Sequence, residues 1–253
     1  MNTLEKTMTD LLGRGIDVTH VSEMPLNAPV LEVLRLTSRK NAVYLIKTPD
    51  RELVLKVFEN DRWEREQTIL LSCQSRGVLA PKPLLMGEGF IVMDYLKGPN
   101  LCDLVNETLD PVYPRMIARW LADFHGNLGD EEVTLVKSDA KLQNFILTER
   151  GVAGLDFELA HEGDPLEDLG EVCAHILNTD PMFIEEKYAL CDQFLRCYLS
   201  ITDHSLEGIT YWVVSALKEA AHFRPDQRER LEKEIEELDR GEVWPFYHHD
   251  QKR

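Results

Sequence analysis

The first third of the chain carries short apolar stretches at the spacing of β-strands. Segments 30–36, 42–48 and 52–58 are rich in Val, Ile, Leu and Tyr, and the Pro-Asp-Arg sequence between the last two is a turn signal. Two further apolar stretches, 81–87 and 89–96, resemble a hairpin. We therefore predict a small β-sheet in this part of the chain.

Helical periodicity interrupts this strand pattern once. Between residues 61 and 76 the apolar positions recur at helical spacing, and Gly77 is a typical terminator. Residues 1–13 also predict a short helix that ends at Gly13 or Gly15.

Beyond a connector at 96–100, which contains a Gly-Pro breaker, the pattern becomes mainly helical. Short strands are expected within 144–147 and 152–157, around a turn at 149–151. The predicted helices cover 111–128 and approximately 165–178, 183–200, 205–223 and 225–240. The pattern predicts an α+β, bilobal fold, with a β-rich N-terminal lobe (1–95), a helical C-terminal lobe (96–253) and a ligand at the seam between the lobes.

Bulk properties narrow the class of partner. The 253 residues carry a formal net charge of −17, which argues against binding to nucleic acid or to an anionic membrane, because both need a basic face. The five cysteines are an odd number and form no Cys-x-x-Cys pair, as expected for reduced thiols. With no signal-peptide pattern and no long apolar run, we expect a cytoplasmic protein.

Lys56 is the first candidate for chemistry. It lies centrally in the apolar strand 52–58, where a lysine is either an edge residue that extends its amine to water or a cation that binds nucleotide phosphates. The second role requires an anionic partner, and Glu66 on the following helix is suited to it. A solvated helix face would equally explain Glu66 on its own.

Three polar residues around the predicted hairpin form the second candidate. The hairpin would bring Asp156 back beside Asn144, and a carboxylate with an amide oxygen suits Mg²⁺. Asp139 would then accept or orient the proton of an attacking hydroxyl group. An Asx-turn or a strand start explains each residue separately, but it explains the three in this order poorly.

The ordered set Lys56, Glu66, Asp139, Asn144 and Asp156 resembles the protein-kinase-like superfamily. The segment LDFELAHEGDPLEDLGEV (155–172) is similar to the D-[FW]-E-x-A-x-x-G-D-P-x-x-D-L signature of its aminoglycoside phosphotransferase and choline kinase branch. LADFHG (121–126) and GVLAPKPL (77–84) also resemble that branch, and the likeness extends from about residue 40 to about residue 180.

The resemblance implies a role for each residue of the set. Lys56 would contact the phosphates of ATP or GTP and pair with Glu66, and Asp139 would be the catalytic base. Asn144 and Asp156 would bind Mg²⁺, while Asp168 would brace the catalytic loop. The segment 94–98 would meet the adenine, and its candidate contact residues are Asp94, Tyr95 and Leu96.

The chain departs from the family at three places. Lys137 and Ser138 precede the base where the family usually has His-Gly or His-Asn, and we expect this change to be tolerated. Lys141, two residues after the base, is a feature of many Ser/Thr protein kinases and would steady the γ-phosphate. The phosphate loop, 35–44, has no glycine, so Ser38 and Asn41 would donate from their side chains, with charge from Arg39 or Lys40.

These observations predict an ATP- and Mg²⁺-dependent kinase for a hydroxyl group on a small polar molecule. The net charge would suit a cationic acceptor, with Glu185, Glu186 or Asp192 near it. Two alternatives stay open. Lys141 favours a small Ser/Thr protein kinase, and the glycine-free loop favours a catalytically silent pseudokinase that binds nucleotide or acts as a scaffold.

Overall fold

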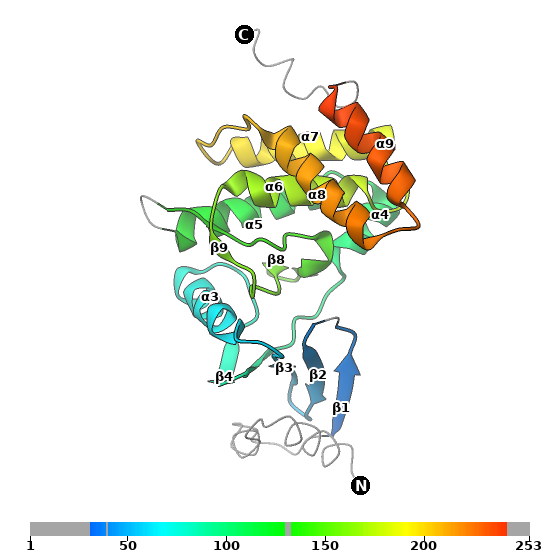
Figure 1. The fold of residues 1–253 in the computed structure, drawn as a ribbon. Helices are drawn as coiled ribbons and strands as arrows, with labels where there is room; N and C mark the ends of the chain where they lie inside the picture. The colour runs from blue at the N-terminus through cyan, green and yellow to red at the C-terminus, as the bar shows by residue number, and fades with distance from the viewer. Residues whose placement is uncertain (1–30, 39, 130–132, 242–253) are drawn as a thin grey trace. The chain divides into compact units, whose positions relative to one another are not determined.

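The computed structural model describes residues 31–38, 40–129 and 133–241, and the helix predicted at 1–13 lies outside them. The chain divides into two compact units, which are described separately. One unit is Met1–Ser75 with Ala80–Leu96, and the other is Arg76–Leu79 with Lys97–Arg253. We call them the sheet unit and the helical unit (Figure 1).

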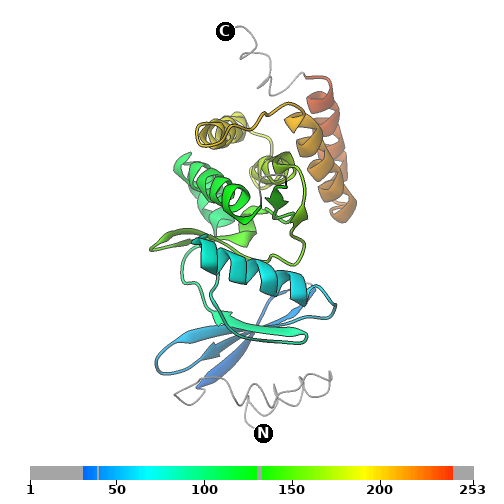
Figure 2. The same cartoon turned by 90° about the vertical axis from the view of Figure 1, so that its left-hand side faces the viewer.

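The sheet unit contains one antiparallel sheet of five strands in the order β1-β2-β3-β5-β4. The strands are β1 (Glu32–Leu36), β2 (Ala42–Lys47), β3 (Glu52–Val57), β4 (Pro83–Gly87) and β5 (Phe90–Asp94). Helix α3 (Trp63–Arg76) follows β3 in the chain and appears as the cyan helix beside the sheet in Figure 2. Strand alternation and the helical period therefore predicted the elements of this unit.

The two faces of β3 have different chemistry. Leu53, Leu55 and Val57 alternate along the strand and belong to one buried apolar cluster with residues of β2 and β5. Lys56 points to the opposite face, because successive side chains of a strand alternate. That face is the side on which α3 presents Glu66, as shown by the contact between the two side chains.

The helical unit is built from six α-helices within its described residues: α4 (Leu101–Thr108), α5 (Val112–Leu128), α6 (Pro165–Leu177), α7 (Glu185–Leu199), α8 (Ile209–Phe223) and α9 (Arg228–Asp239). Two short antiparallel pairs join them, β6 (Leu135–Val136) with β9 (His161–Glu162) and β7 (Phe145–Thr148) with β8 (Gly151–Gly154). Helix α4 was not predicted, because eight residues are too few to show a helical period.

An aromatic cluster lies beneath the β7–β8 hairpin. Trp120 of α5 stacks on Phe124 at a centroid distance of 5.1 Å and meets Phe145 edge-on at 5.3 Å. Phe157 stacks on Phe124 at 5.9 Å. Gly154 is required here, since a Cβ atom would come within 2.3 Å of the Trp120 ring. The hairpin therefore packs on a buried aromatic cluster.

The α+β fold class is confirmed, with an antiparallel sheet and a helix in one unit and helices in the other. Across the described ranges, helices long and apolar enough to span a membrane are absent.

Candidate active site

Lys56 and Glu66 form a buried ion pair in the sheet unit. The Nζ atom of Lys56 lies 2.6 Å from Oε2 of Glu66, and the two side chains are 7% and 2% exposed. The pair joins the C-terminal end of β3 to the first turn of α3. A buried charge is tolerated when a partner compensates it, so this geometry fixes the ammonium group in position. Lys56 is therefore not an edge residue that extends into water.

The glycine-free loop between β1 and β2 is closed by side chains. The hydroxyl oxygen of Ser38 accepts a hydrogen bond from the backbone N–H of Asn41 at 3.4 Å. Asn41 is buried, and its amide oxygen accepts from the backbone N–H of Glu59, also at 3.4 Å. Both residues thus hold the loop in shape, while Arg39 lies outside the described residues.

The segment after β5 is anchored through its backbone. The N–H of Asp94 donates to the backbone carbonyl of Lys82 at 3.0 Å, and the N–H of Tyr95 donates to the backbone carbonyl of Glu52 at 3.2 Å. Tyr95 is 37% exposed, and Asp94 and Leu96 are partly buried. The predicted adenine contacts thus lie at the C-terminal end of β5, and their role stays a prediction.

In the helical unit, Asp139 is at the centre of a short loop between β6 and β7. Its Oδ1 atom accepts from the Nζ of Lys141 at 2.7 Å, and its Oδ2 atom accepts from the Nδ2 of Asn144 at 2.9 Å. The same Nδ2 atom also donates to the backbone carbonyl of Asp139 at 2.9 Å. After the role predicted for them, we call residues 137–144 the catalytic loop. The structure therefore brings three predicted site residues into direct contact.

The charges in this loop alter the acidity of its groups. Burial alone would raise the pKa of Asp139, but the charges of Lys137 and Lys141, with hydrogen bonds from Lys141 and Asn144, lower that pKa overall. Burial would lower the pKa of Lys141, and the Asp139 carboxylate outweighs it, so the lysine pKa is raised. Asp139 is therefore held as a carboxylate.

Helix α6 holds the catalytic loop through three acidic side chains. Asp168, which is fully buried, accepts from the backbone N–H groups of Lys137 and Ser138 at 2.6 and 2.8 Å. Glu167 accepts from the hydroxyl of Ser138 at 2.7 Å. Glu171 accepts from the backbone N–H of Ala140 at 2.6 Å. Carboxylates spaced three and four residues apart share one helix face, which explains how one helix reaches the whole loop.

A buried histidine supports Asp168 from the other side. The Nε2 atom of His125, in the last turn of α5, lies 2.9 Å from Oδ2 of Asp168. Its Nδ1 atom lies 2.8 Å from the hydroxyl of Tyr198 on α7. Helices α5, α6 and α7 are therefore linked at the point where the catalytic loop is attached.

Lys137 contributes more than the sequence suggested. The side chain is fully buried, and its Nζ atom donates to the backbone carbonyls of Asp139 at 2.6 Å and Asp156 at 3.0 Å. The replacement of the family's histidine was expected only to be tolerated. The structure shows instead that this lysine joins two segments that carry predicted site residues.

Asn144 and Asp156 offer oxygens of the kind that Mg²⁺ prefers. Because the amide nitrogen of Asn144 donates to Asp139, the amide oxygen is the atom left to face a metal. The backbone N–H of Leu155 donates to the carbonyl of Asn144 at 2.8 Å, which places the two segments side by side. Carboxylate oxygens of Asp156 and Glu158 lie within 4.8 Å of each other. The donor set of the helical unit thus fits a hard divalent cation.

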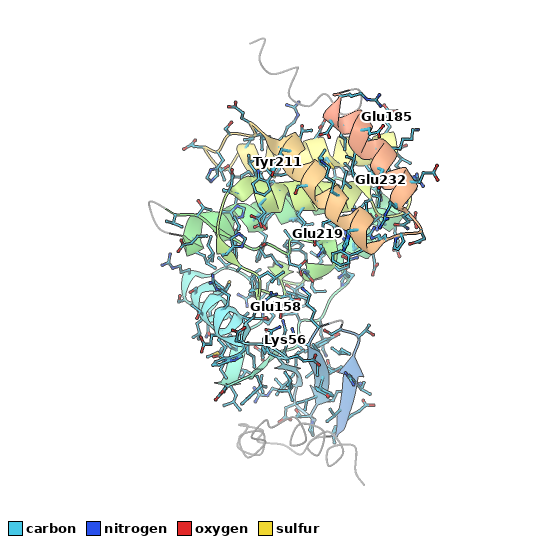
Figure 3. The ribbon with its side chains drawn as sticks, viewed as in Figure 1. Lys56, Glu158, Glu185, Tyr211, Glu219 and Glu232 are labelled. Atoms are coloured by element: carbon cyan, nitrogen blue, oxygen red, sulfur yellow. The ribbon has the colours of Figure 1, made fainter. Side chains whose placement is uncertain are left out.

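Two further acidic residues surround Lys141. Its Nζ atom lies 3.7 Å from Oε1 of Glu171, and the charge of Glu219 on α8 also contributes to its raised pKa. Burial, followed by the Asp139 charge, raises the pKa of Glu171 to about 7. Glu219 and Glu185 lie far apart in Figure 3. The acidic residues that act on Lys141 are Asp139, Glu171 and Glu219, and the suggestion that Glu185, Glu186 or Asp192 lies near an acceptor stays a prediction.

Sequence reasoning missed the roles of Lys137, Glu158, Glu167 and Glu171. For Glu167 and Glu171 a signal was present, because they are four residues apart, with Asp168 between them, just after the Gly-Asp-Pro start of α6. Lys137 gave no such signal, since its acceptors are backbone atoms.

Comparison with known proteins identifies the fold. No protein-family model and no curated protein sequence matches the chain. Among solved structures, a choline/ethanolamine kinase family protein from Mesorhizobium loti is similar to it with a TM-score of 0.67 and 14% identity, over 90% of this chain and 95% of that one. Aminoglycoside phosphotransferase APH(4)-Ia gives a TM-score of 0.64 and 12% identity, over 88% and 96%.

A third similar structure is the ternary complex of streptomycin and ATP with aminoglycoside phosphotransferase APH(2")-IIa, with a TM-score of 0.58 and 16% identity over 79% of this chain and 86% of that one. The fold is thus that of the aminoglycoside phosphotransferase and choline kinase branch of protein-kinase-like structures, as its sequence resemblance implied.

Proposed function

We propose that this protein is an ATP- and Mg²⁺-dependent phosphotransferase that moves the γ-phosphate to a hydroxyl group of a small polar molecule. The observation that carries the proposal is the catalytic loop, in which Asp139, Lys141 and Asn144 are in direct contact. The fold supports it, because similar structures include small-molecule kinases, one of them solved with ATP.

Each residue of the predicted site has a role in this proposal. Lys56, fixed by Glu66, positions the nucleotide phosphates. Asn144 and Asp156 hold Mg²⁺, which neutralises phosphate charge when bound. Asp139 orients the acceptor hydroxyl and takes its proton, and Lys141 exchanges its contact with Asp139 for one with the γ-phosphate.

Two features favour a small acceptor over a protein substrate. Only residues 157–164 separate Asp156 from the start of α6, which leaves no long segment to hold a peptide. The carboxylates of Asp139 and Glu171, with Glu219 near Lys141, make an acidic environment at the loop. This acidic environment supports a cationic acceptor. For the phosphate donor, GTP is the alternative to ATP.

The pseudokinase alternative rests on the glycine-free loop. Against it, the pairing of Lys56 with Glu66 is kept in the interior, where an ion pair costs desolvation energy. A scaffold also has no use for a base, yet Asp139 retains an ordered set of donors.

The deciding experiment measures nucleotide binding and turnover separately. Thermal melts with ATP, with and without Mg²⁺, are compared for wild type, Asp156→Asn, Asp139→Asn and the control Asp203→Asn, which changes an exposed aspartate. Binding at 100 times the dissociation constant stabilises by about 2.7 kcal/mol, so we expect a Mg²⁺-dependent rise of several degrees. The rise should disappear in Asp156→Asn alone.

Turnover is then followed as ADP release with a panel of hydroxyl and amino-sugar acceptors. Asp139→Asn should lower it by about 10²- to 10⁴-fold, the usual contribution of a positioned base, while the thermal rise is kept. Wild-type turnover in Asp139→Asn would refute the base assignment. A wild type that shows no thermal rise would favour the scaffold alternative.

A further inference from the structure

We propose that Lys137 is a positioning residue whose ammonium group fixes the backbone of Asp139 and the backbone of Asp156 together. The roles of those two aspartates rest on the proposed function, whereas the link between their backbones rests on geometry alone. The inference assigns a specific task to a residue at which this chain departs from the family pattern.

The geometry places one cation between two segments that are distant in sequence. The Nζ atom of Lys137 donates to the carbonyl of Asp139 at 2.6 Å and to that of Asp156 at 3.0 Å. It also lies 5.9 Å from the ring centroid of Phe145 and 5.5 Å from that of Phe157, within cation–π range. The side chain has no solvent exposure, so these contacts replace its hydration.

Both segments contain a residue in a costly backbone conformation. Ser138 has a φ of 56° and Asp156 has a φ of 59°, in the left-handed region that non-glycine residues rarely adopt. Each such residue costs about 1–2 kcal/mol, and it persists only where its surroundings hold it. Lys137 binds the carbonyl of Asp156 itself and the carbonyl of the residue after Ser138.

A lysine is suited to this task in a way that a neutral histidine is not. An ammonium group has three donors that can diverge, whereas a neutral imidazole has one N–H. The lysine is held in turn at its backbone N–H, which donates to Oδ2 of Asp168 at 2.6 Å. Burial would raise the pKa of Asp139, and the charges of Lys137 and Lys141 are among the influences that lower it.

The helical unit contains a matched control. Lys187 on α7 is also fully buried, and its Nζ atom donates to Oδ1 of Asn106 and Oγ1 of Thr179, both at 2.9 Å, and to the Thr179 carbonyl. These partners belong to α4 and to the segment after α6, so the three hydrogen bonds of Lys187 go to residues outside the catalytic loop. Replacing either lysine by methionine removes a buried ammonium group of the same size.

The test compares Lys137→Met with Lys187→Met in the full chain. Hydrogen exchange followed by mass spectrometry, without nucleotide, should show lost protection in peptides covering 137–145 and 155–158 only in Lys137→Met. With ATP present, the Mg²⁺ concentration for half-maximal thermal shift should rise about 10- to 100-fold, as is typical when a group that orients metal ligands is removed. Binding of ATP without Mg²⁺ should match that of Lys187→Met.

The outcomes separate this inference from the proposed function. Equal exchange at both segments in the two variants would overturn the inference, whatever the wild type does with ATP. A wild type without a Mg²⁺-dependent shift would overturn the proposed function, and the exchange pattern would still decide the role of Lys137. If Lys137→Met does not fold, Lys137→Gln keeps one neutral donor group. Protection at both segments in that variant would overturn the inference, and protection at one would support it.

Discussion

The sheet unit and the helical unit each bury a lysine, and they compensate its charge differently. In the sheet unit the Nζ atom of Lys56 meets the carboxylate of Glu66 at 2.6 Å. In the helical unit the Nζ atom of Lys137 donates to two backbone carbonyls, at 2.6 and 3.0 Å. The first arrangement joins a strand to a helix, and the second joins two loop segments.

The difference determines what remains when the lysine is removed. Loss of Lys56 leaves the buried Glu66 carboxylate without this cation. The unfolding free energy then falls strongly, because the interior solvates a charge poorly. Loss of Lys137 leaves neutral carbonyls, each of which costs about 1–3 kcal/mol when unsatisfied. We therefore expect the sheet unit to suffer mainly in stability and the helical unit mainly in the precision of its loop.

The largest effect is expected for Lys56→Met. Breaking a buried ion pair at one partner costs about 3–5 kcal/mol of unfolding free energy. The double variant Lys56→Met/Glu66→Leu should recover most of the loss without recovering turnover, as measured by urea unfolding and ADP release. Lys47→Met, which removes a partly exposed lysine 2.8 Å from Glu32, should change stability little. If Lys56→Met were as stable as the double variant, the Glu66 carboxylate would not depend on Lys56 for its compensation.

The next effect is a pH dependence in the helical unit. The pKa of Glu171 is raised from 4.5 to about 7, first by burial and then by the Asp139 charge, with Lys141 opposing and Asp168 adding to the rise. The folded state therefore binds a proton more tightly than the unfolded state does, and stability falls as the pH rises from about 4.5 to about 7.

Glu171→Gln should remove this dependence. At about 1.4 kcal/mol per pKa unit, the loss across that window is up to about 3 kcal/mol in the wild type. Urea unfolding at pH 5 and pH 8 measures it, and Glu185→Gln, at an exposed position, should keep the wild-type difference. An unchanged difference in Glu171→Gln would contradict the assignment.

The smallest effect is expected for Asp168→Asn. The two carboxylate oxygens of Asp168 each accept from one loop N–H group, and asparagine keeps one of these oxygens, so we expect the loss of one charge-assisted hydrogen bond, about 1.5–3 kcal/mol. Asp164→Asn is the control at the start of the same helix, where asparagine caps as well as aspartate does. Equal unfolding free energies for the two variants would mean that the charge of Asp168 does not hold the loop.

Sequence patterns predicted the elements that are long enough to show a periodic arrangement of apolar residues. They also predicted the contact between two side chains, Lys56 and Glu66. The strands and the helices α3 and α5–α9 have clear periodicity, whereas α4 is eight residues long and β6 and β9 are two residues each. Lys56 and Glu66 could be paired in advance because one lies on a strand and the other on the next helix. The task of Lys137 could not, because any residue supplies a backbone carbonyl.

The attachment of the catalytic loop to α6 has a consequence for engineering. Residues 136–177 contain the loop, the β7–β8 hairpin and the helix whose carboxylates hold the loop. The hydrogen bonds that hold the loop to α6 have both partners within these residues, so the stretch is a candidate unit for grafting. Helix α8 packs directly on α6, where Gly170 meets Trp212, and the charge of its Glu219 acts on Lys141, so a graft of this stretch should carry α8 with it.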